Sequence, residues 1–327
     1  MAPKYSRFPF LLLSALLALS FCKPSSSSGI VVYWGTHTDE KEGTLAEACF
    51  TGLYSIVNIG FLNVFGGGQT PSLGLSKHCS EYPCTSLIPQ IKQCQEIGVK
   101  VFISIGGAPE YSNYTLTSSE DAKSVADYIW NNFLGGESEN RTFGDAILDG
   151  VDLDIRGFTT EHWDELVRYL HEYNNIAEKR FHLSAAAQCA YPDPYLNKAI
   201  QTGLFDYVWV GFYNDPSCEY NNVNGDDVLL KQAWHRWWTA LLIVGNTNTK
   251  LFLGLPATLE AAPGGGYIPV DVLERECQYF KLFKPQYGGV SLWDRHHDRS
   301  SGYSSQIKSS CEPEDAFSAE KLISYVF

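Results

Sequence analysis

The feature that most constrains the fold is an alternation of short apolar runs with longer amphipathic stretches. The runs are rich in Val, Ile, Phe and Tyr, which is typical of strands buried on both faces of a parallel sheet. The eight runs are Ile30–Trp34, Ser55–Phe61, Lys100–Ile105, Ala146–Ile155, Phe181–Ala186, Tyr207–Phe212, Leu251–Leu255 and Gly289–Trp293. The helical stretches between them include Cys84–Ile97, Glu120–Leu134, Glu161–Asn174, Val228–Leu241 and Val270–Phe280.

Eight strands that alternate with helices indicate a parallel β/α architecture. An open, doubly wound sheet is the alternative, but no GxGxxG motif follows the first strand. The length of 327 residues would allow two domains, but no linker-like composition divides the chain between about residues 29 and 312. We therefore predict an α/β fold, a single-domain (β/α)8 TIM barrel over residues 29–312, with its active site at the C-terminal ends of the strands.

The N-terminus has the pattern of a secretory signal peptide. Lys4 and Arg7 precede an apolar stretch over Phe8–Leu19, and small residues follow as far as Ser28. Roughly a dozen apolar residues are too few to span a bilayer comfortably. We predict that residues 1–28 are removed and that the protein is secreted, to the extracellular space, the apoplast or a vacuole. Residues 313–327 form either a C-terminal extension or a last helix.

The cysteine count favours disulfide bridges. Loss of Cys22 with the signal peptide leaves eight of the nine cysteines, an even number in a secretory context. Cys79 and Cys84 are close enough in sequence for a small-loop bridge. A metal site is less well supported, because no CxxC or paired Cys/His spacing occurs. Two N-glycosylation sequons, at Asn113 and Asn140, fall in loop-like sequence.

The formal net charge of −13 argues against nucleic acid as a partner, since binding to phosphates requires clusters of Lys and Arg. No hydrophobic run of membrane-spanning length follows the signal peptide. The acidic balance fits a protein whose ligands are neutral, such as sugars. We expect a monomer with no cofactor and no membrane partner.

The most informative segment is Asp149–Arg156, with the sequence DGVDLDIR. Asp152, Asp154 and Arg156 share one face of a strand because side chains alternate, and Asp149 precedes them by three residues. Buried carboxylates on a central strand are costly unless they are paired or functional. The segment is therefore either a structural ion-pair network with Arg156 as the counter-ion or a catalytic strand, present or ancestral.

This segment resembles the DxxDxDxE motif of glycoside hydrolase family 18, which reads DGxDxDxE in the plant class III chitinases of that family. The resemblance covers nearly the whole mature chain and implies a (β/α)8 barrel. Residues 197–202 and 262–267 are similar to concanavalin B, and residues 42–49 and 292–295 to chitinase-like xylanase inhibitors. The other matching segments are Ile30–Gly35, Val57–Asn63, Ser104–Gly107, Asp127–Gly136, Gly203–Val210, Phe212–Asn214, Phe252–Ala257 and Tyr287–Trp293.

The resemblance assigns roles to particular residues. In this family a carboxylic acid protonates the glycosidic oxygen, while the acetamido oxygen of the substrate attacks the anomeric carbon. The resemblance implies that Asp154 orients the acetamido group, that Tyr213 hydrogen-bonds its carbonyl, and that Asp152 couples to Asp154. It also implies that Trp293 forms the floor of the sugar subsite and that Tyr33 belongs to the same binding site.

The acid itself is replaced, because Arg156 stands at its position in the motif. A guanidinium cannot release a proton at neutral pH, and its charge opposes an oxocarbenium-like centre. We expect Arg156 to contact Asp154 or a neighbouring carboxylate and to lower the pKa of Asp154. Two further departures are Gly211, where the chitinases carry Gln, and the loop Gly107–Tyr111, which differs from the glycine-rich loop of the family.

Four disulfide pairs follow from the resemblance and from subtraction. The resemblance pairs Cys49 with Cys94, Cys79 with Cys84, and Cys189 with Cys218. Cys277 and Cys311 remain and are expected to form the fourth bridge. A free thiol at Cys277 would remove that bridge.

Several other residues have ordinary structural interpretations. Trp234, Trp237 and Trp238 could stack on sugars, but their spacing favours a helix packed on the barrel. His296 and His297 could bind a metal, but no partner motif accompanies them, and we expect solvated loop histidines and no metal site. Asp226 and Asp227 are expected to be a charge pair at a helix start.

Together these observations predict a secreted chitinase-like protein without the catalytic glutamate. Such a protein would bind a carbohydrate or another protein without hydrolysing it, as a glycosidase inhibitor or a seed storage or defence protein. The partners expected are chitin, N-acetylglucosamine oligomers or a microbial glycosidase. The alternatives are an endochitinase with residual or altered hydrolysis of N-acetylglucosamine polymers, and a purely structural or storage protein with no ligand.

Overall fold

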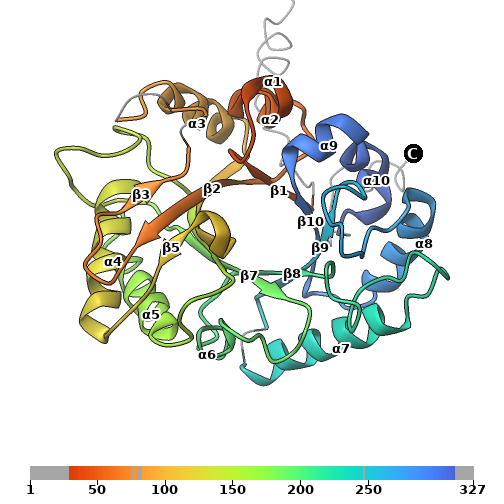
Figure 1. Cartoon of the computed structure of the whole chain (residues 1–327). Helices are drawn as coiled ribbons and strands as arrows, with labels where there is room; N and C mark the ends of the chain where they lie inside the picture. Colours follow the sequence, from red (N-terminus) through yellow and green to blue (C-terminus); the bar gives the residue numbers. More distant parts are fainter. Residues whose placement is uncertain (1–28, 76, 80–82, 246, 314–327) are drawn as a thin grey trace, which may run out of the picture.

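The computed structural model describes residues 29–75, 77–79, 83–245 and 247–313. Its eight parallel strands are hydrogen-bonded in the order β1-β10-β9-β8-β7-β6-β4-β2, and β2 pairs again with β1 to close the barrel (Figure 1). The predicted (β/α)8 TIM barrel is therefore confirmed. The strands are β1 Ile30–Trp34, β2 Ile56–Phe65, β4 Lys100–Gly107, β6 Gly150–Ile155, β7 His182–Gln188, β8 Tyr207–Gly211, β9 Lys250–Pro256 and β10 Tyr287–Trp293.

Helices surround this ring of strands (Figure 1). The five helices predicted from the sequence are present, as α3 Leu87–Glu96, α4 Ser119–Phe133, α5 Trp163–Tyr173, α7 Val228–Ile243 and α8 Val270–Phe280. Short elements carried too little periodicity to be predicted. They are α1 Asp39–Glu42, α2 Leu45–Phe50, α6 Asn197–Ile200, α9 Arg295–Ser301, α10 Tyr303–Cys311, the 3-10 turn η1 Pro109–Tyr111, β3 Ser72–Leu73 and β5 Asn113–Tyr114.

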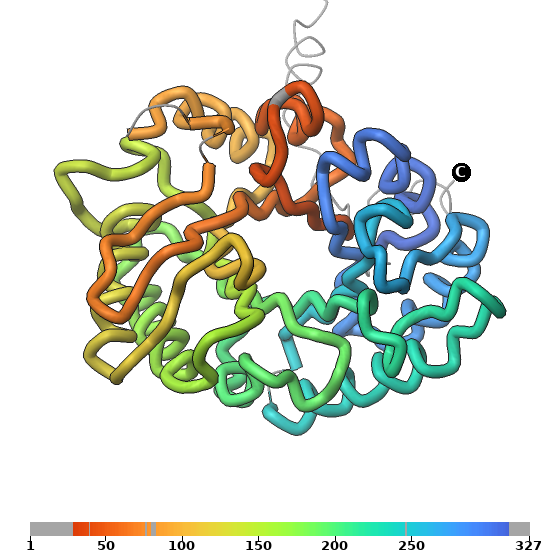
Figure 2. Tube along the Cα trace, in the orientation of Figure 1, coloured from red at the N-terminus to blue at the C-terminus, as the bar shows by residue number. Residues whose placement is uncertain are grey.

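Closure brings the first and last strands of the chain side by side. Val31 pairs with Ser291 of β10 on one side and with Ile56 of β2 on the other. Figure 2 shows the red and blue ends of the described chain meeting at this seam. Residues that are far apart in sequence, on the loops after β1 and β10, therefore become neighbours at one rim of the barrel.

The hydrophobic core has two parts. The larger part fills the layer between strands and helices, and it includes Trp34, Trp163, Trp234 and Trp237, all of them fully buried. The smaller part fills the barrel interior with Tyr33, Phe102, Trp209, Phe252 and their neighbours. A filled interior is the usual state of such barrels, so a ligand of the barrel itself would bind at its mouth.

The strand predicted over Ala146–Ile155 is too long at its start. The backbone N–H groups of Ala146 and Leu148 donate to Phe143 and Phe133, so these residues belong to the irregular segment between α4 and β6. The strand begins at Gly150, where a Cβ would lie 2.6 Å from the His182 carbonyl oxygen. Only a glycine allows β7 to approach β6 so closely at this level.

All four predicted disulfides are present. Cys49 pairs with Cys94, Cys79 with Cys84, Cys189 with Cys218, and Cys277 with Cys311. The last bridge ties α8 to α10, which confirms the pair obtained by subtraction. The signal-peptide prediction for residues 1–28 and the tail prediction for residues 314–327 lie outside the described residues. Among the residues described, no helix is both long and apolar enough to cross a membrane.

The other structural interpretations can be compared with the fold. Trp234 and Trp237 are buried on α7 as expected, and Asp227 stands at its start in an ion pair with Lys231. Asn140 is exposed in a turn. Asn113 was expected in a loop but belongs to the short strand β5, where its side chain remains exposed.

Candidate functional site

The candidate site is built around β6, whose alternation turns Asp152 and Asp154 toward the barrel axis. Asp152 is completely buried and accepts four hydrogen bonds. The donors are Tyr33 Oη at 2.8 Å, Ser104 Oγ at 2.7 Å, Ser184 Oγ at 2.8 Å and Trp209 Nε1 at 2.8 Å. Ser104 and Ser184 are the register partners of Asp152 on β4 and β7, so the parallel pairing itself places both hydroxyls. Burial and the neighbouring Asp154 charge raise the pKa of Asp152 to about 6.

Asp154 lies one step nearer the mouth and has a different environment. Its register partner on β4 is Gly106, which presents no side chain. Among the described residues its hydrogen-bond donor is Arg156, whose Nε lies 2.6 Å from Asp154 Oδ1. The Arg156 side chain is 32% exposed, whereas that of Asp154 is 2% exposed. The expected charge-assisted contact between Arg156 and Asp154 is therefore confirmed.

The pKa of Asp154 differs from the expectation. Burial raises it, and the Arg156 charge and hydrogen bond lower it without overcoming the effect of burial. Arg156 therefore lowers the pKa of Asp154 as predicted, but the net pKa is raised because burial has the larger effect. For Arg156 the balance is reversed. Burial is the largest single effect and lowers its pKa, but the Asp154 charge and hydrogen bond, together with Tyr213 and Tyr33, outweigh burial, so the pKa of the guanidinium is raised and it stays charged.

Arg156 is positioned by the loop before α4. Its backbone N–H donates to Tyr114 Oη at 2.9 Å, and Tyr114 Oη donates to the Gly107 carbonyl at 3.0 Å. Pro109 of η1 packs against Gly157, where a Cβ would lie 2.6 Å from Pro109 Cγ. The unusual loop after β4 therefore packs directly against the end of β6.

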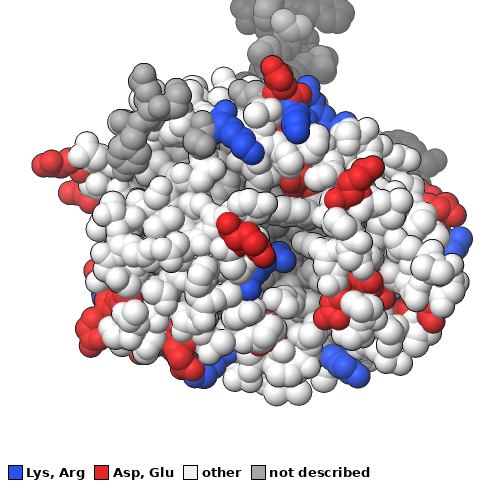
Figure 3. Space-filling model, in the orientation of Figure 1, with Lys and Arg blue, Asp and Glu red and all other residues white. Residues whose placement is uncertain are grey.

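A small pocket opens above these residues. The three remaining predicted site residues, Tyr33, Tyr213 and Trp293, all line it together with Arg156. Its enclosed space is about 10 Å³, near the least that holds one water molecule. The full lining is Tyr33, Arg156, Ala186, Ala187, Trp209, Gly211, Tyr213, Gly254, Ser291 and Trp293. Figure 3 shows a hollow in the middle of this face, with basic and acidic side chains at its edge.

Aromatic rings form one wall of the pocket. The ring centroids of Tyr33 and Trp293 are 5.5 Å apart, and Phe61 lies 5.9 Å from Tyr33 and 6.2 Å from Trp293. Tyr213 also lines the pocket, and burial raises the pKa of its hydroxyl. A Cβ at Gly211 would lie 3.2 Å from the Tyr213 ring, so Gly211 leaves room for the observed position of that ring.

Asp149 does not join the other site residues. It precedes β6 at the opposite end of the strand from Arg156. Its Oδ2 accepts from the Val101 backbone N–H at 2.8 Å and from Gln95 Nε2 at 2.9 Å, and its Oδ1 pairs with Lys179 at 2.6 Å. These contacts fasten α3, β4 and the loop before β7 to the start of β6, which is a structural role.

Sequence reasoning missed four side chains that hold the site. Ser104, Ser184 and Trp209 donate to Asp152, and Tyr114 holds the Arg156 backbone. Aligning the predicted parallel strands would have placed both serines at the level of Asp152. No sequence signal marks Tyr114, because its contact depends on the path of a loop.

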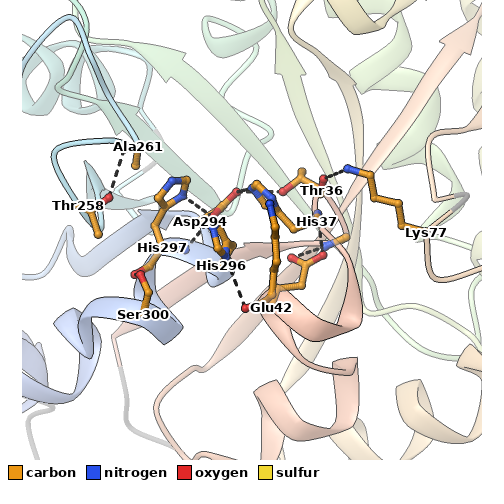
Figure 4. A network of polar contacts seen from close by, with 12 residues as sticks. Thr36, His37, Glu42, Lys77, Thr258, Ala261, Asp294, His296, His297 and Ser300 are labelled. Carbon is orange, nitrogen blue, oxygen red and sulfur yellow. Dashed lines mark hydrogen bonds and ion pairs between the residues drawn. The ribbon is translucent and has the colours of Figure 1, made fainter.

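A second polar cluster lies at the rim between the loops that follow β1 and β10 (Figure 4). Asp294 is completely buried and contacts His37 and His297. His296 and His297 were expected to be solvated loop histidines, but both are half-buried on α9. The expectation failed because α9 begins directly after β10 and turns these rings toward the loop after β1.

Comparison with known proteins yields a consistent set of relatives. Residues 29–264 match the family model "Glycosyl hydrolases family 18". A protein named acidic endochitinase, from Phaseolus angularis, is 50% identical over 298 residues, which cover 90% of this chain and 94% of that protein. The structure of concanavalin B is 39% identical with a TM-score of 0.79, covering 87% of this chain and 99% of that one. The xylanase and alpha-amylase inhibitor protein XAIP-II from Scadoxus multiflorus is 40% identical with a TM-score of 0.76, covering 86% and 97% of the two chains.

Proposed function

The chain belongs to glycosyl hydrolases family 18, and from this membership we propose that it is a secreted, non-catalytic member that binds a saccharide at the barrel mouth. The observation that carries the proposal is the Arg156–Asp154 pair at the end of β6. Arg156 occupies the place at which the family motif has its acid. The carboxylate that would orient the acetamido group is instead held by that arginine.

Proton donation is the step that this site lacks. A guanidinium whose pKa is raised by Asp154 does not release a proton at neutral pH. General acid catalysis contributes about 10²–10⁴-fold to such reactions. The charge of Arg156 also stands where positive charge would develop on the sugar, so it opposes the reaction a second time.

Neighbouring carboxylates are poor substitutes for the missing acid. The pKa of Asp152, about 6, is suitable for an acid, but Asp152 is fully buried and its two oxygens accept four hydrogen bonds. Asp154 can donate only if it is protonated and leaves Arg156. Glu110 on η1 is exposed near the end of β6, so a Glu110→Gln variant is needed to test it as the proton donor.

Saccharide binding is supported by the aromatic wall of Tyr33, Phe61 and Trp293. Apolar ring faces beside hydrogen-bonding groups are the usual lining of a site for a neutral ligand. Chitin-type substrates are the ligands of the family, so N-acetylglucosamine oligomers are the first to test. The narrow pocket implies that they bind along the rim rather than with a sugar seated beside Asp154.

Two other candidates rest on specific relatives. Inhibition of a glycosidase is supported by the likeness to XAIP-II, whose name describes a xylanase and alpha-amylase inhibitor. An endochitinase with residual activity is supported by the 50% identity to the acidic endochitinase. Arg156 weighs against the second of these candidates and is neutral toward the first.

The test combines turnover of chitin oligomers with calorimetric titration of non-hydrolysed N-acetylglucosamine oligomers. We expect no turnover by the wild-type protein above buffer, together with measurable oligomer binding. Arg156→Glu restores an acid and removes the charge, so it should gain a small activity. The gain is limited because Gly211 and the altered loop leave the acetamido group loosely held, and misplacement by about 1 Å can cost 10²-fold. Arg156→Gln, which removes the charge without supplying an acid, is the matched control.

Three results would change the proposal. Wild-type turnover that is abolished by Asp154→Ala would show that the protein is an enzyme. Turnover that survives Asp154→Ala but is lost in Glu110→Gln would assign the acid to η1. No gain in Arg156→Glu and no oligomer binding would place the function on another surface and favour the glycosidase partner.

A further inference from the structure

We propose that His37, Asp294 and His297 form a binding site for a divalent transition-metal ion of the Zn²⁺ class at the rim of the barrel. The three residues come from three places in the chain, namely the loop after β1, the end of β10 and the first turn of α9. One possible ligand atom from each lies within 4.8 Å of the others. Figure 4 shows the Asp294 carboxylate between the two rings.

The distances among the three groups suit a tetrahedral ion. His37 Nε2 lies 3.2 Å from Asp294 Oδ2, and His297 Nδ1 lies 2.9 Å from Asp294 Oδ1. Zinc binds imidazole nitrogen and carboxylate oxygen at 2.0–2.2 Å, which separates neighbouring ligand atoms by about 3.3 Å in a tetrahedron. An ion bound by all three groups would bring their ligand atoms, now within 4.8 Å of one another, to about 3.3 Å, and it would replace the hydrogens that now join each ring to the carboxylate.

The ligands are held by neighbours in the manner of a prepared metal site. Thr36 Oγ1 donates to Asp294 Oδ2 at 2.9 Å, which fixes the plane of the carboxylate. The buried carboxylate of Glu42 accepts from the backbone N–H groups of Gly35 at 3.1 Å and His37 at 2.8 Å. These contacts fix the loop that presents His37. Asp294 is also the N-cap of α9, so its position does not depend on an ion.

The donor set indicates the class of metal. Two imidazoles and one carboxylate suit Zn²⁺ and Cu²⁺, whereas Ca²⁺ and Mg²⁺ prefer a shell made of oxygen. Three protein ligands leave a fourth position open, as in zinc sites that take an external ligand. The His296 ring is 4.3 Å from that of His37 and 4.8 Å from that of His297, so it borders the site. Asp294 directly follows Trp293, which places the ion at the edge of the saccharide pocket.

The ordinary alternative is that the two histidines serve only as hydrogen-bond partners of the buried Asp294. That alternative accounts for the contacts of the carboxylate, but it predicts no specific affinity for a metal. The two explanations therefore differ in a measurable property of the intact protein.

The experiment is a calorimetric titration of the tag-free, full mature protein with Zn²⁺ alone. We expect one ion per chain, a rise in thermal stability with Zn²⁺, and a visible absorption spectrum when Co²⁺ replaces Zn²⁺. His37→Gln and His297→Gln each remove a direct ligand. Each should therefore lower the affinity by more than about 10–100-fold, which is the loss typical of removing only an outer-shell partner. His235→Gln, an exposed histidine on α7, is the matched control and should bind as the wild type does.

Several results would overturn the site. These are no saturable binding to the wild type, unchanged affinity in both rim variants, and a loss in only one of them. Asp294→Asn is unsuitable as the primary test because it also alters the cap of α9. Cooperative thermal unfolding of both histidine variants in a chelator, at a temperature well above that of the titration, would show that they are folded, so that a lost affinity reports the ligands.

Discussion

Two buried carboxylates at the barrel mouth make an instructive comparison. Asp154 stands at the end of β6 and Asp294 follows the end of β10, and both are removed from solvent beside basic side chains. Burial raises the pKa of Asp154, and Arg156 does not reverse that. Burial acts on Asp294 in the same direction, but hydrogen bonds from His297 and His37 outweigh it and hold the pKa of that carboxyl well below its usual range.

The difference comes from the donors. Within the described part of the chain, Asp154 accepts from the Arg156 side chain alone, and that side chain is partly exposed. Asp294 accepts from the Thr36 hydroxyl, the His37 and His297 rings and the His297 backbone N–H. Each donor stabilises the charged form, but Asp152 also accepts four hydrogen bonds and still has a raised pKa, so neighbouring charges matter as well: the His37 charge lowers the pKa of Asp294, whereas the Asp154 charge raises that of Asp152. The two carboxyls on β6 therefore have raised pKa values, whereas Asp294 stays ionised and is a fixed negative centre between two histidines.

The largest expected effect comes from removing the fixed centre. Asp294→Ala leaves two rings and a hydroxyl without their partner and takes the N-cap from α9. We expect a loss of about 3–5 kcal/mol in the free energy of unfolding, the range for breaking a buried pair. Urea unfolding of the variant and the wild type measures the loss. A loss under about 1 kcal/mol would mean that water or a rotated ring replaces the carboxylate easily.

An intermediate effect is expected in the pH dependence of stability. The pKa of Asp152, about 6, lies above its unfolded value, so its contribution increases as the pH falls from about 6 to about 4, by at most about 3 kcal/mol. Asp294 has a lowered pKa, so its contribution is present above about pH 4 and is lost as the pH falls further. Urea unfolding from pH 3 to pH 7, compared with Asp152→Asn, should show the first slope vanish in that variant.

If Asp152→Asn leaves the slope between pH 4 and pH 6 unchanged, another group is responsible for it. Asp154 is the first to examine, because burial raises its pKa as well. The acid limb below pH 4 serves as the internal control, because it should be retained in Asp152→Asn.

The smallest effect is expected at Asp154. Asp154→Asn removes a negative charge next to Asp152 and frees an Arg156 side chain that already reaches solvent. These changes oppose each other, so the free energy of unfolding should change by less than about 1 kcal/mol. Asp294→Asn, which carries the same substitution, is the matched comparison and should lose clearly more. Equal losses in the two asparagine variants would contradict the contrast between the two sites.

Much of the fold follows from local sequence. The eight apolar runs predicted the eight barrel strands, with most ends displaced by only a few residues. The error at Ala146–Leu148 arose because an apolar turn and a buried strand have the same composition. The short helices α1, α6 and α9 were missed because helices of fewer than eight residues show almost no periodicity. The disulfide partners came from likeness to a family and from subtraction, not from spacing.

The candidate site was likewise predicted only in part from the sequence. Strand alternation placed Asp152, Asp154 and Arg156 on one face, and the contact between the last two followed from their charges. The family motif, not alternation, grouped Asp149 with these residues, but Asp149 precedes β6 and is separated from Arg156 by the length of that strand. The net pKa of Asp154 was also misjudged, because the degree of burial is a tertiary quantity.

The sequence by itself determined the alternation of eight strands with helices, the chemistry of the β6 face and the presence of Arg156 at its end. These properties depend on residue type and on a period of two, both of which are local. Only the tertiary structure decided that Ser104 and Ser184 satisfy Asp152, that the pocket is narrow, and that His37 meets Asp294 and His297. Thr36 and Asp294 are 258 residues apart and become neighbours because the barrel closes β1 against β10. Closure and strand register are set by the packing of the whole chain, and no local pattern contains them.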